Sequence, residues 1–305
     1  MPTIRFASLA LVGLCLCSCG EEKQTAKEQQ VAEEQHATRE QYPTVSEEVV
    51  QGIARTNLDH PDPTQAQLDR KARSIEIVKD LDLPYIEHLP VVEDAAQVDP
   101  RDAQEVAQRC IALLMCAVKG ELRGVDDAFI PDLVEEWSAA PYFSPNESDF
   151  MADSDPTPQE YLDNSWGYEC VHVLLWALGH LDELQPPNTI CDVPTEVALV
   201  RELGADAFVE NASLRDIDEI LDAADLYYRL HWAAIELRLN GETSPHVDEG
   251  IIRERHRALN WLIRYMDAEW DDVTTDTYYL HGLPWHCAAI PRDRGTPGLE
   301  VWAPC

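Results

Sequence analysis

The stretch SWGYECVHVLLWALGHL, residues Ser165 to Leu181, decides how the fold is interpreted. At about 100° per residue its apolar side chains surround the whole helix axis, which is typical of a helix buried on every side. Glu169 and His172 therefore lie where apolar residues are expected. A buried carboxylate must be paired, hydrogen-bonded or protonated, so Glu169 needs a partner from elsewhere in the chain. The stretch is too short to cross a bilayer.

Helical spacing of apolar residues recurs along most of the chain after Pro63. We predict one helix over about Thr157–Leu181 and a loop over Ser144–Pro158. The other predicted helices run over Thr64–Leu81, from the pair Asp99-Pro100 to Gly120, over Asp126–Ala139, over Pro194–Leu203, from a capping-box-like Ser213–Asp216 to Asn240, and from Asp248 to about Met266. Strand signals are weak throughout. The sequence therefore predicts an all-α fold, a single irregular helical bundle over residues 63–280.

The same placement of residues around the helix axis, applied to the other predicted helices, suggests a partner for Glu169. Arg255 falls in the apolar face of the last predicted helix, and arginine offers a bidentate fork to a carboxylate. The acidic stripe around Asp222 and Asp225 on the long helix is a second possible partner for Arg255, and His231 lies on the apolar side of that helix. One interpretation is a buried ion-pair network that fixes helix register. The other is a cleft with a perturbed carboxylate, where acid–base sites arise.

Metal and cofactor chemistry find little support in the motifs. Glu169 and His172 match the Glu-x-x-His pattern of di-iron bundles, but those bundles need the pattern twice and no second copy is present. The sequence also lacks the GxSxG, Walker and GxGxxG motifs. We therefore expect no metal and no cofactor. Residues Trp270–Asp276 form an acidic, hydroxyl-rich turn that either stops a helix or offers a weak cation site of oxygen ligands.

Charge and cysteines restrict the partners and the compartment. The formal net charge of −34 argues against nucleic acid as a partner, because such binding needs Lys and Arg to meet phosphates. Cys110 and Cys170 fall in apolar helical stretches, where a free thiol behaves as a small hydrophobe. Cys191, Cys287 and Cys305 lie in loops or in the tail and are disulfide candidates, whose connectivity the sequence does not give.

The N-terminus indicates export. Residues 6–16 form an apolar region after Arg5, and Leu16-Cys17-Ser18-Cys19 then resembles a bacterial lipobox. That resemblance implies a lipoprotein signal peptide over residues 1–18 and a lipid on the thiol of Cys19, which would hold the chain at a membrane. The alternative is an ordinary secretory signal. Gly20, in place of Asp, implies a lipid-anchored protein of the cell envelope at the outer membrane, facing the periplasm.

Two further segments flank the predicted bundle. Residues 19–62 are rich in Glu, Gln, Lys and Ala and poor in large apolar side chains, which predicts a disordered, charged tether. Residues 281–305 are rich in proline and show little periodicity, which predicts an irregular tail.

Several blocks resemble a known family: SWGYECVHVLLWALGHLDEL, EILDAADLYYRLHWAAIELRLNG, ERHRALNWLI and WDDVTTDT, in this order. They are similar to the bacterial family called domain of unknown function 4272, over roughly Leu68–Thr277. The resemblance implies a helical domain and no activity. His172 is not part of the family pattern, which further weakens the metal hypothesis. The polar positions that match are Trp166, Glu169, Asp225, Tyr228, Arg229, His231, Trp232, Glu254, Arg255, His256, Asn260, Trp261, Asp271, Asp272, Thr275 and Asp276.

Two functions from different classes follow. The first is a lipid-anchored envelope protein whose helical domain binds a protein partner or a small ligand, with candidate binding residues Asp225, Arg229, Trp232 and Trp261. The alternative is a hydrolase-like envelope enzyme, with Glu169 and His231 or His256 as acid–base groups and Arg255 as an anion clamp. The enzyme requires a pocket that opens to solvent and contains these side chains. A sealed core with Glu169 bonded to Arg255 would contradict it.

Overall fold

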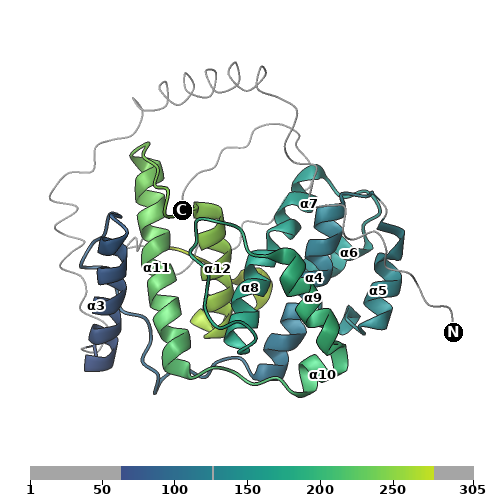
Figure 1. Ribbon diagram of the computed structural model, residues 1–305, viewed down its shortest axis with the longest axis horizontal. Helices are drawn as coiled ribbons and strands as arrows, with labels where there is room; N and C mark the ends of the chain where they lie inside the picture. The colour runs from purple at the N-terminus through teal and green to yellow at the C-terminus, as the bar shows by residue number, and fades with distance from the viewer. Residues whose placement is uncertain (1–62, 126, 278–305) are drawn as a thin grey trace, which may run out of the picture. The chain divides into compact units, whose positions relative to one another are not determined.

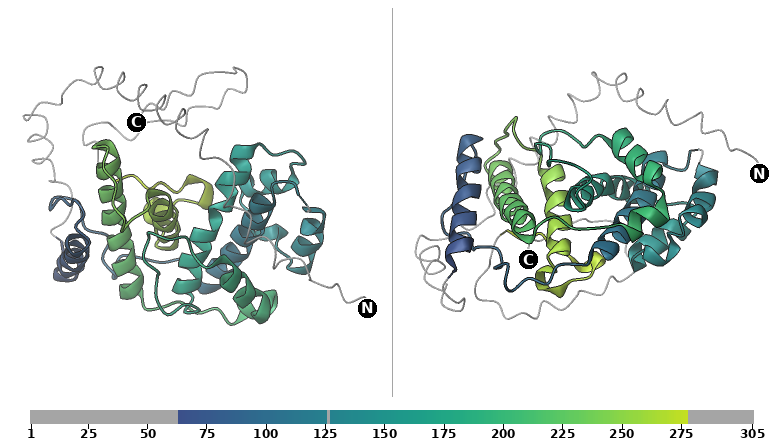
Figure 2. Two further views of the ribbon diagram at one scale, coloured as in Figure 1. Left: turned by 45° about the horizontal axis from the view of Figure 1, so that its top comes forward. Right: turned by 60° about the horizontal axis from the view of Figure 1, so that its bottom comes forward.

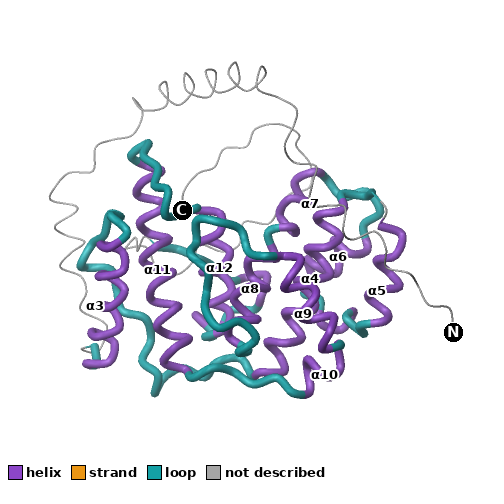
Figure 3. Tube along the Cα trace, viewed as in Figure 1, coloured by secondary structure: helices purple, strands orange, loops and turns teal. Residues whose placement is uncertain are grey.

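The computed structural model describes residues 63–125 and 127–277, which belong to one compact unit. Helices and loops make up these residues and no strand occurs among them (Figure 3), so the predicted all-α class is confirmed. The predicted signal peptide, the tether and the tail after residue 280 lie outside the described residues. No described helix combines the length and the apolar composition that a membrane crossing needs.

Five helices pack one against the next. In order of contact they are α3 (Gln65–Asp80), α11 (Ile217–Leu239), α12 (Glu249–Leu262), α8 (Gly167–Ala177) and α4 (Ala103–Leu122) (Figures 1 and 2). Because α8 lies between α12 and α4, each of its residues is buried, as the all-round apolar pattern predicts. The odd polar residues of α8 are therefore part of the protein core.

Four of the remaining helices contact α4. They are α5 (Ile130–Glu136), α6 (Pro145–Ala152), α7 (Pro158–Ser165) and α10 (Ala205–Glu210), whereas α9 (Val193–Leu203) contacts α8 and α10. The contact between α4 and α7 is unusually close at Gly120, where a Cβ atom would lie 2.7 Å from the backbone nitrogen of Ser165 and the carbonyl oxygen of Tyr161. Gly120 was predicted to end its helix, but α4 continues to Leu122 and the glycine instead admits the neighbouring backbone.

The predicted single helix over Thr157–Leu181 is wrong, because the chain forms two helices that meet at Trp166. The amide of Glu169 bonds the carbonyl of Trp166, three residues back, so the turn between α7 and α8 is tighter than an α-helical turn. Helix α7 begins with a capping box at Thr157 and α8 ends at Ala177. The break lets both short helices pack along α4.

Other helix ends also differ from prediction. Ser144–Pro158 is not all loop, because Ser144 and Glu147 form the capping box of α6. Helix α4 starts after Asp102 and not at Asp99, since the amide of Arg101 is bound to the carbonyl of Leu262. Asp216, and not Ser213, caps α11. Helix α12 ends at Leu262 and not near Met266. The short helix α10 was not predicted. The predicted helix starts at Thr64 and Asp248 are confirmed, and the structure shows that each of these residues is an N-cap.

Candidate functional site

Glu169 of α8 and Arg255 of α12 form the predicted ion pair. The Nε atom of Arg255 lies 2.8 Å from Oε2 of Glu169, and the residues are 0% and 2% exposed. Burial opposes the charge on Arg255, but Tyr227 and Glu169 favour it, and the pKa of the guanidinium rises above its usual value. The alternative partners Asp222 and Asp225 are wrong, because both bind other arginines.

Two further hydrogen bonds of this pair go to a surface loop. The second carboxylate oxygen of Glu169 accepts the backbone N–H of Cys191 at 2.8 Å. Arg255 Nη1 donates to the backbone carbonyl of Gln185 and to the hydroxyl of Tyr227. Residues 179–192, which join α8 to α9, are here named the anchored loop. Two of its backbone groups therefore end on a charge pair inside the core.

A second buried pair binds the same loop. His172 Nδ1 lies 2.6 Å from Oε1 of Glu196, and the two residues are 1% and 3% exposed. The backbone N–H of Gln185 donates to His172 Nε2, so Nδ1 carries the imidazole proton and donates it to Glu196. His172 thus binds the N–H of the peptide unit at Gln185, and Arg255 binds the carbonyl that follows it.

We name Glu169, His172, Glu196 and Arg255 the loop anchor. Glu169 and His172 bind different partners within it, which is inconsistent with the joint metal ligation that the Glu-x-x-His pattern suggests. Among the described residues, no group of three or more His, Cys, Asp and Glu side chains is placed to hold a metal ion. Glu196 was missed from sequence, since an acidic residue in the first turn of a helix is ordinary there and only the fold places it against His172.

His231 and His256 form a separate pair between α11 and α12. Their Nδ1 atoms lie 3.0 Å apart, so one ring donates and the other accepts a single proton. Burial, and then Arg253 and Arg238, lower the pKa of His231 to about 4. Burial and the neighbouring His231 hold the pKa of His256 well below its usual value. The two imidazoles bond each other and not Glu169, so the predicted acid–base set is not assembled.

Asp225 and Arg229 bind each other in a bidentate pair, with N–O distances of 2.8 and 2.7 Å. Arg229 also donates to the carbonyl of Pro90. These two residues are 0% and 2% exposed. Asp225 and Arg229, two of the four predicted binding residues, therefore form a buried contact that joins α11 to the segment after α3.

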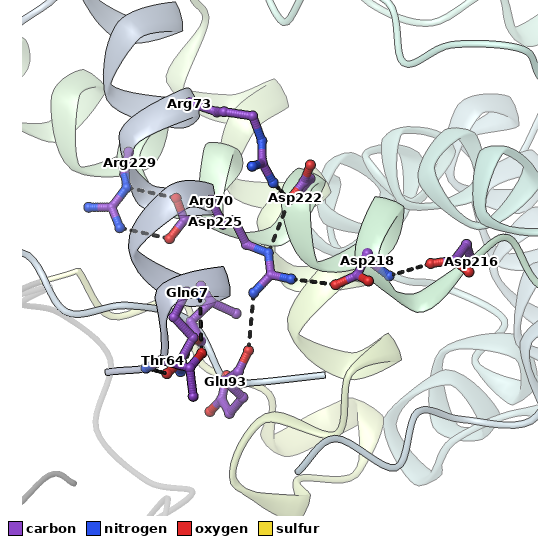
Figure 4. Close-up of polar contacts among 11 residues, drawn as sticks. Thr64, Gln67, Arg70, Arg73, Glu93, Asp216, Asp218, Asp222, Asp225 and Arg229 are labelled. Atoms are coloured by element: carbon purple, nitrogen blue, oxygen red, sulfur yellow. Dashed lines mark hydrogen bonds and ion pairs between the residues drawn. The ribbon is translucent and has the colours of Figure 1, made fainter. Parts of the chain in front are cut away.

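The rest of the acidic stripe faces α3 (Figure 4). Arg70 of α3 reaches Asp218 and Asp222 of α11, and Arg73 also binds Asp222. Arg70 is 2% exposed, whereas the side chains of Asp218 and Asp222 are 66% and 42% exposed, so these ion pairs lie at the solvent edge of the contact between α3 and α11. This stripe fastens the first described helix to the row of helices and does not form an open binding site.

Trp232 and Trp261 also belong to the core, at 6% and 3% exposed. Trp261 packs edge-on against Trp270 with ring centroids 5.7 Å apart. Beside Trp270, the carboxylate of Asp271 accepts hydrogen bonds from the hydroxyl of Ser144 and from the backbone N–H of Asn146. The 270–276 turn therefore contacts the start of α6, and the contacts of Asp271 favour the structural interpretation over a cation site.

Cys191, predicted as a disulfide candidate, is a free buried thiol. Burial raises its pKa, so the thiol stays protonated. Cys110, Cys116 and Cys170 are also free and buried. Cys287 and Cys305 lie outside the described residues.

Comparison with protein-family models supports the sequence blocks. The model described as "Domain of unknown function (DUF4272)" matches residues 70–273, two thirds of the chain. The chain belongs to the DUF4272 family. Comparisons with curated proteins and with solved structures each found no match. In this DUF4272 protein the matched range contains the whole loop anchor, the histidine pair and most of α3.

Proposed function

We propose that this DUF4272 protein is a lipid-anchored envelope protein whose helical domain binds a protein partner through the anchored loop. One observation carries the proposal: the buried side chains of Glu169, His172 and Arg255 each form a hydrogen bond with the backbone of a surface loop. The lipobox-like Leu16–Cys19 supports the anchoring, and Gly20 supports a place at the outer membrane facing the periplasm.

Stability alone does not explain the anchor. Replacing a buried ion pair by apolar residues of similar volume is often neutral or stabilising, so a fold does not need such pairs in order to be stable. Binding residues are often found on loops that a rigid scaffold holds in place. Such a loop loses little conformational entropy when a partner binds. The anchored loop fits this pattern, because buried side chains of the core bind its backbone and its residue Ile190 is 63% exposed.

The enzyme alternative has weaker support from the same residues. It needs Glu169, Arg255 and a histidine around a space open to solvent, and these side chains are at least 97% buried and bonded to one another or to backbone. A small ligand would likewise need a cavity beside the candidate binding residues. The geometry therefore favours a protein partner that contacts the surface.

The partner is tested by crosslinking from the loop in the full-length chain, within cells. A photo-crosslinking amino acid replaces Ile190 in one variant and Val125, 65% exposed elsewhere in the domain, in the control. We expect a discrete adduct from position 190 and none from position 125. The adduct should disappear when Glu169→Gln releases the loop. Equal adducts from both positions, or none from position 190, would contradict the proposal.

The anchor is tested at Cys19, with Cys17 as the matched control. We expect Cys19→Ala to abolish labelling by a palmitate analogue and to move the protein out of the membrane fraction. Cys17→Ala changes the same residue type two positions earlier and should keep both properties. Unchanged labelling of Cys19→Ala would show that no lipid is attached there.

A further inference from the structure

Next to the anchored loop, α9 carries a shallow depression that is open to solvent. Its lining includes His180, Pro194, Ala198, Leu199, Glu202 and Leu203. The α9 members recur at helical spacing and form one stripe along the helix. Most of the lining is apolar, and Leu203 is 43% exposed. His180 belongs to the loop itself, so the two surfaces adjoin.

The charge of the depression is negative. Glu202 lies in the last turn of α9, and its carboxylate lines the depression. Partial burial lowers the pKa of His180, whose ring stacks on Phe208 at 5.3 Å, so the imidazole is neutral at pH 7. Arg201 is the neighbouring cation on α9, but it does not line the depression.

We propose that this depression binds a basic segment of the protein partner, with a Lys or Arg at Glu202 and an apolar side chain against Leu199 and Leu203. The proposal rests on the proposed function and names the chemistry of the partner. Complementary charge supports this occupant, because a cation meets the carboxylate of Glu202 and none of the described Lys and Arg residues lines the depression. A second copy of the chain would bring another net charge of −34 and a second Glu202 to the same place, which is repulsive.

The probe is a labelled amphipathic peptide of Leu and Lys, about 12 residues long and so about three helical turns, with a Leu and Glu peptide as its negative control. Fluorescence anisotropy measures its binding to the full-length protein and to two charge-matched variants. Glu202→Lys changes the depression, whereas Glu136→Lys makes the same charge change at an exposed position at the end of α5. We expect Glu202→Lys to weaken binding about tenfold and Glu136→Lys to change it less than twofold.

A further variant tests the apolar half of the contact. Leu203→Ser removes an exposed apolar side chain, so we expect it to weaken binding about threefold or more while the domain stays folded. Failure of the wild-type protein to bind the Lys peptide would overturn the proposal. An equal loss in Glu202→Lys and Glu136→Lys would do so as well, because binding would then follow net charge alone.

Two outcomes separate this proposal from other occupants and from the proposed function. Reversing the charges of Arg292 and Arg294 would raise peptide affinity if the chain's own C-terminal segment filled the depression, and that result overturns a partner as occupant. If the adduct from Ile190 persists in Glu202→Lys, the partner binds the loop without the depression. The inference then fails while the proposed function stands.

Discussion

Replacing Glu169 with glutamine tests the loop anchor, because it removes one charge and keeps the size of the side chain. Both carboxylate oxygens now accept hydrogen bonds, one from Arg255 and one from the amide of Cys191. A glutamine has one oxygen and one NH₂ group, so the NH₂ must face one of these two donors. Arg255, which is 0% exposed, is also left without its counter-charge.

Breaking a buried ion pair by removing one partner destabilises a protein by about 3–5 kcal/mol. We expect Glu169→Gln to lower the free energy of unfolding by about 3 kcal/mol, at the low end because Arg255 keeps its bonds to Tyr227 and Gln185. Urea denaturation followed by circular dichroism measures this change. Hydrogen exchange should also become faster at the amide of Cys191.

Glu249→Gln is the matched control. It removes the same charge from an ion pair with Arg238, whose side chain is 59% exposed, and exposed pairs contribute about 1 kcal/mol or less. A loss of stability in Glu169→Gln no larger than in this control would refute the reasoning. So would unchanged hydrogen exchange at Cys191 in a variant that unfolds more easily.

Two further predictions concern the histidine pair and the contact of α4 with α7. Burial lowers the pKa of His231 from 6.5 to about 4 in the folded protein. Between pH 6.5 and about pH 4 the unfolded chain therefore binds more protons than the folded one, and the free energy of unfolding falls as the pH drops. The expected fall is about 3 kcal/mol. Urea denaturation at pH 7 and pH 4.5 measures the fall, and an equally steep fall in His231→Gln would contradict the assignment. Gly120→Ala should lower stability by about 1–3 kcal/mol, since its Cβ meets backbone atoms at 2.7 Å. Thermal unfolding checks this, and a stability gain, as helix propensity alone predicts, would show that the helices separate freely.

The pairing of Glu169 with Arg255 could be predicted from sequence because each lies on a helix face whose other side chains are apolar. A buried charge needs an opposite charge, and few candidates existed. His231 was recognised as unusual in the same way, but its pairing with His256 depends on the register between α11 and α12. Helix periodicity places a residue on a face and does not fix that register.

Other features depend on contacts that no local pattern reports. Helical spacing of apolar residues continues on both sides of the break at Trp166, which follows the polar residues Asp163–Ser165, so periodicity alone predicts one helix. Glu196 acquires its role only when α9 packs on α8. The capping box of Ser144 was present in the sequence, but the short polar helix that follows it was outweighed by the turn-forming residues around it.

The loop anchor also makes the order of folding matter. Glu169 and Arg255 are separated by 86 positions, so Glu169 emerges during synthesis long before its counter-charge. Until Arg255 is present, burying α8 would leave the carboxylate of Glu169 without its counter-charge in an apolar interior, which costs free energy. We therefore expect α8 to become stably buried only when α12 packs against it, and a chain that ends before Arg255 to keep a long apolar segment exposed. Chaperones and proteases act on chains that expose apolar segments, so an incomplete bundle would be retained or degraded.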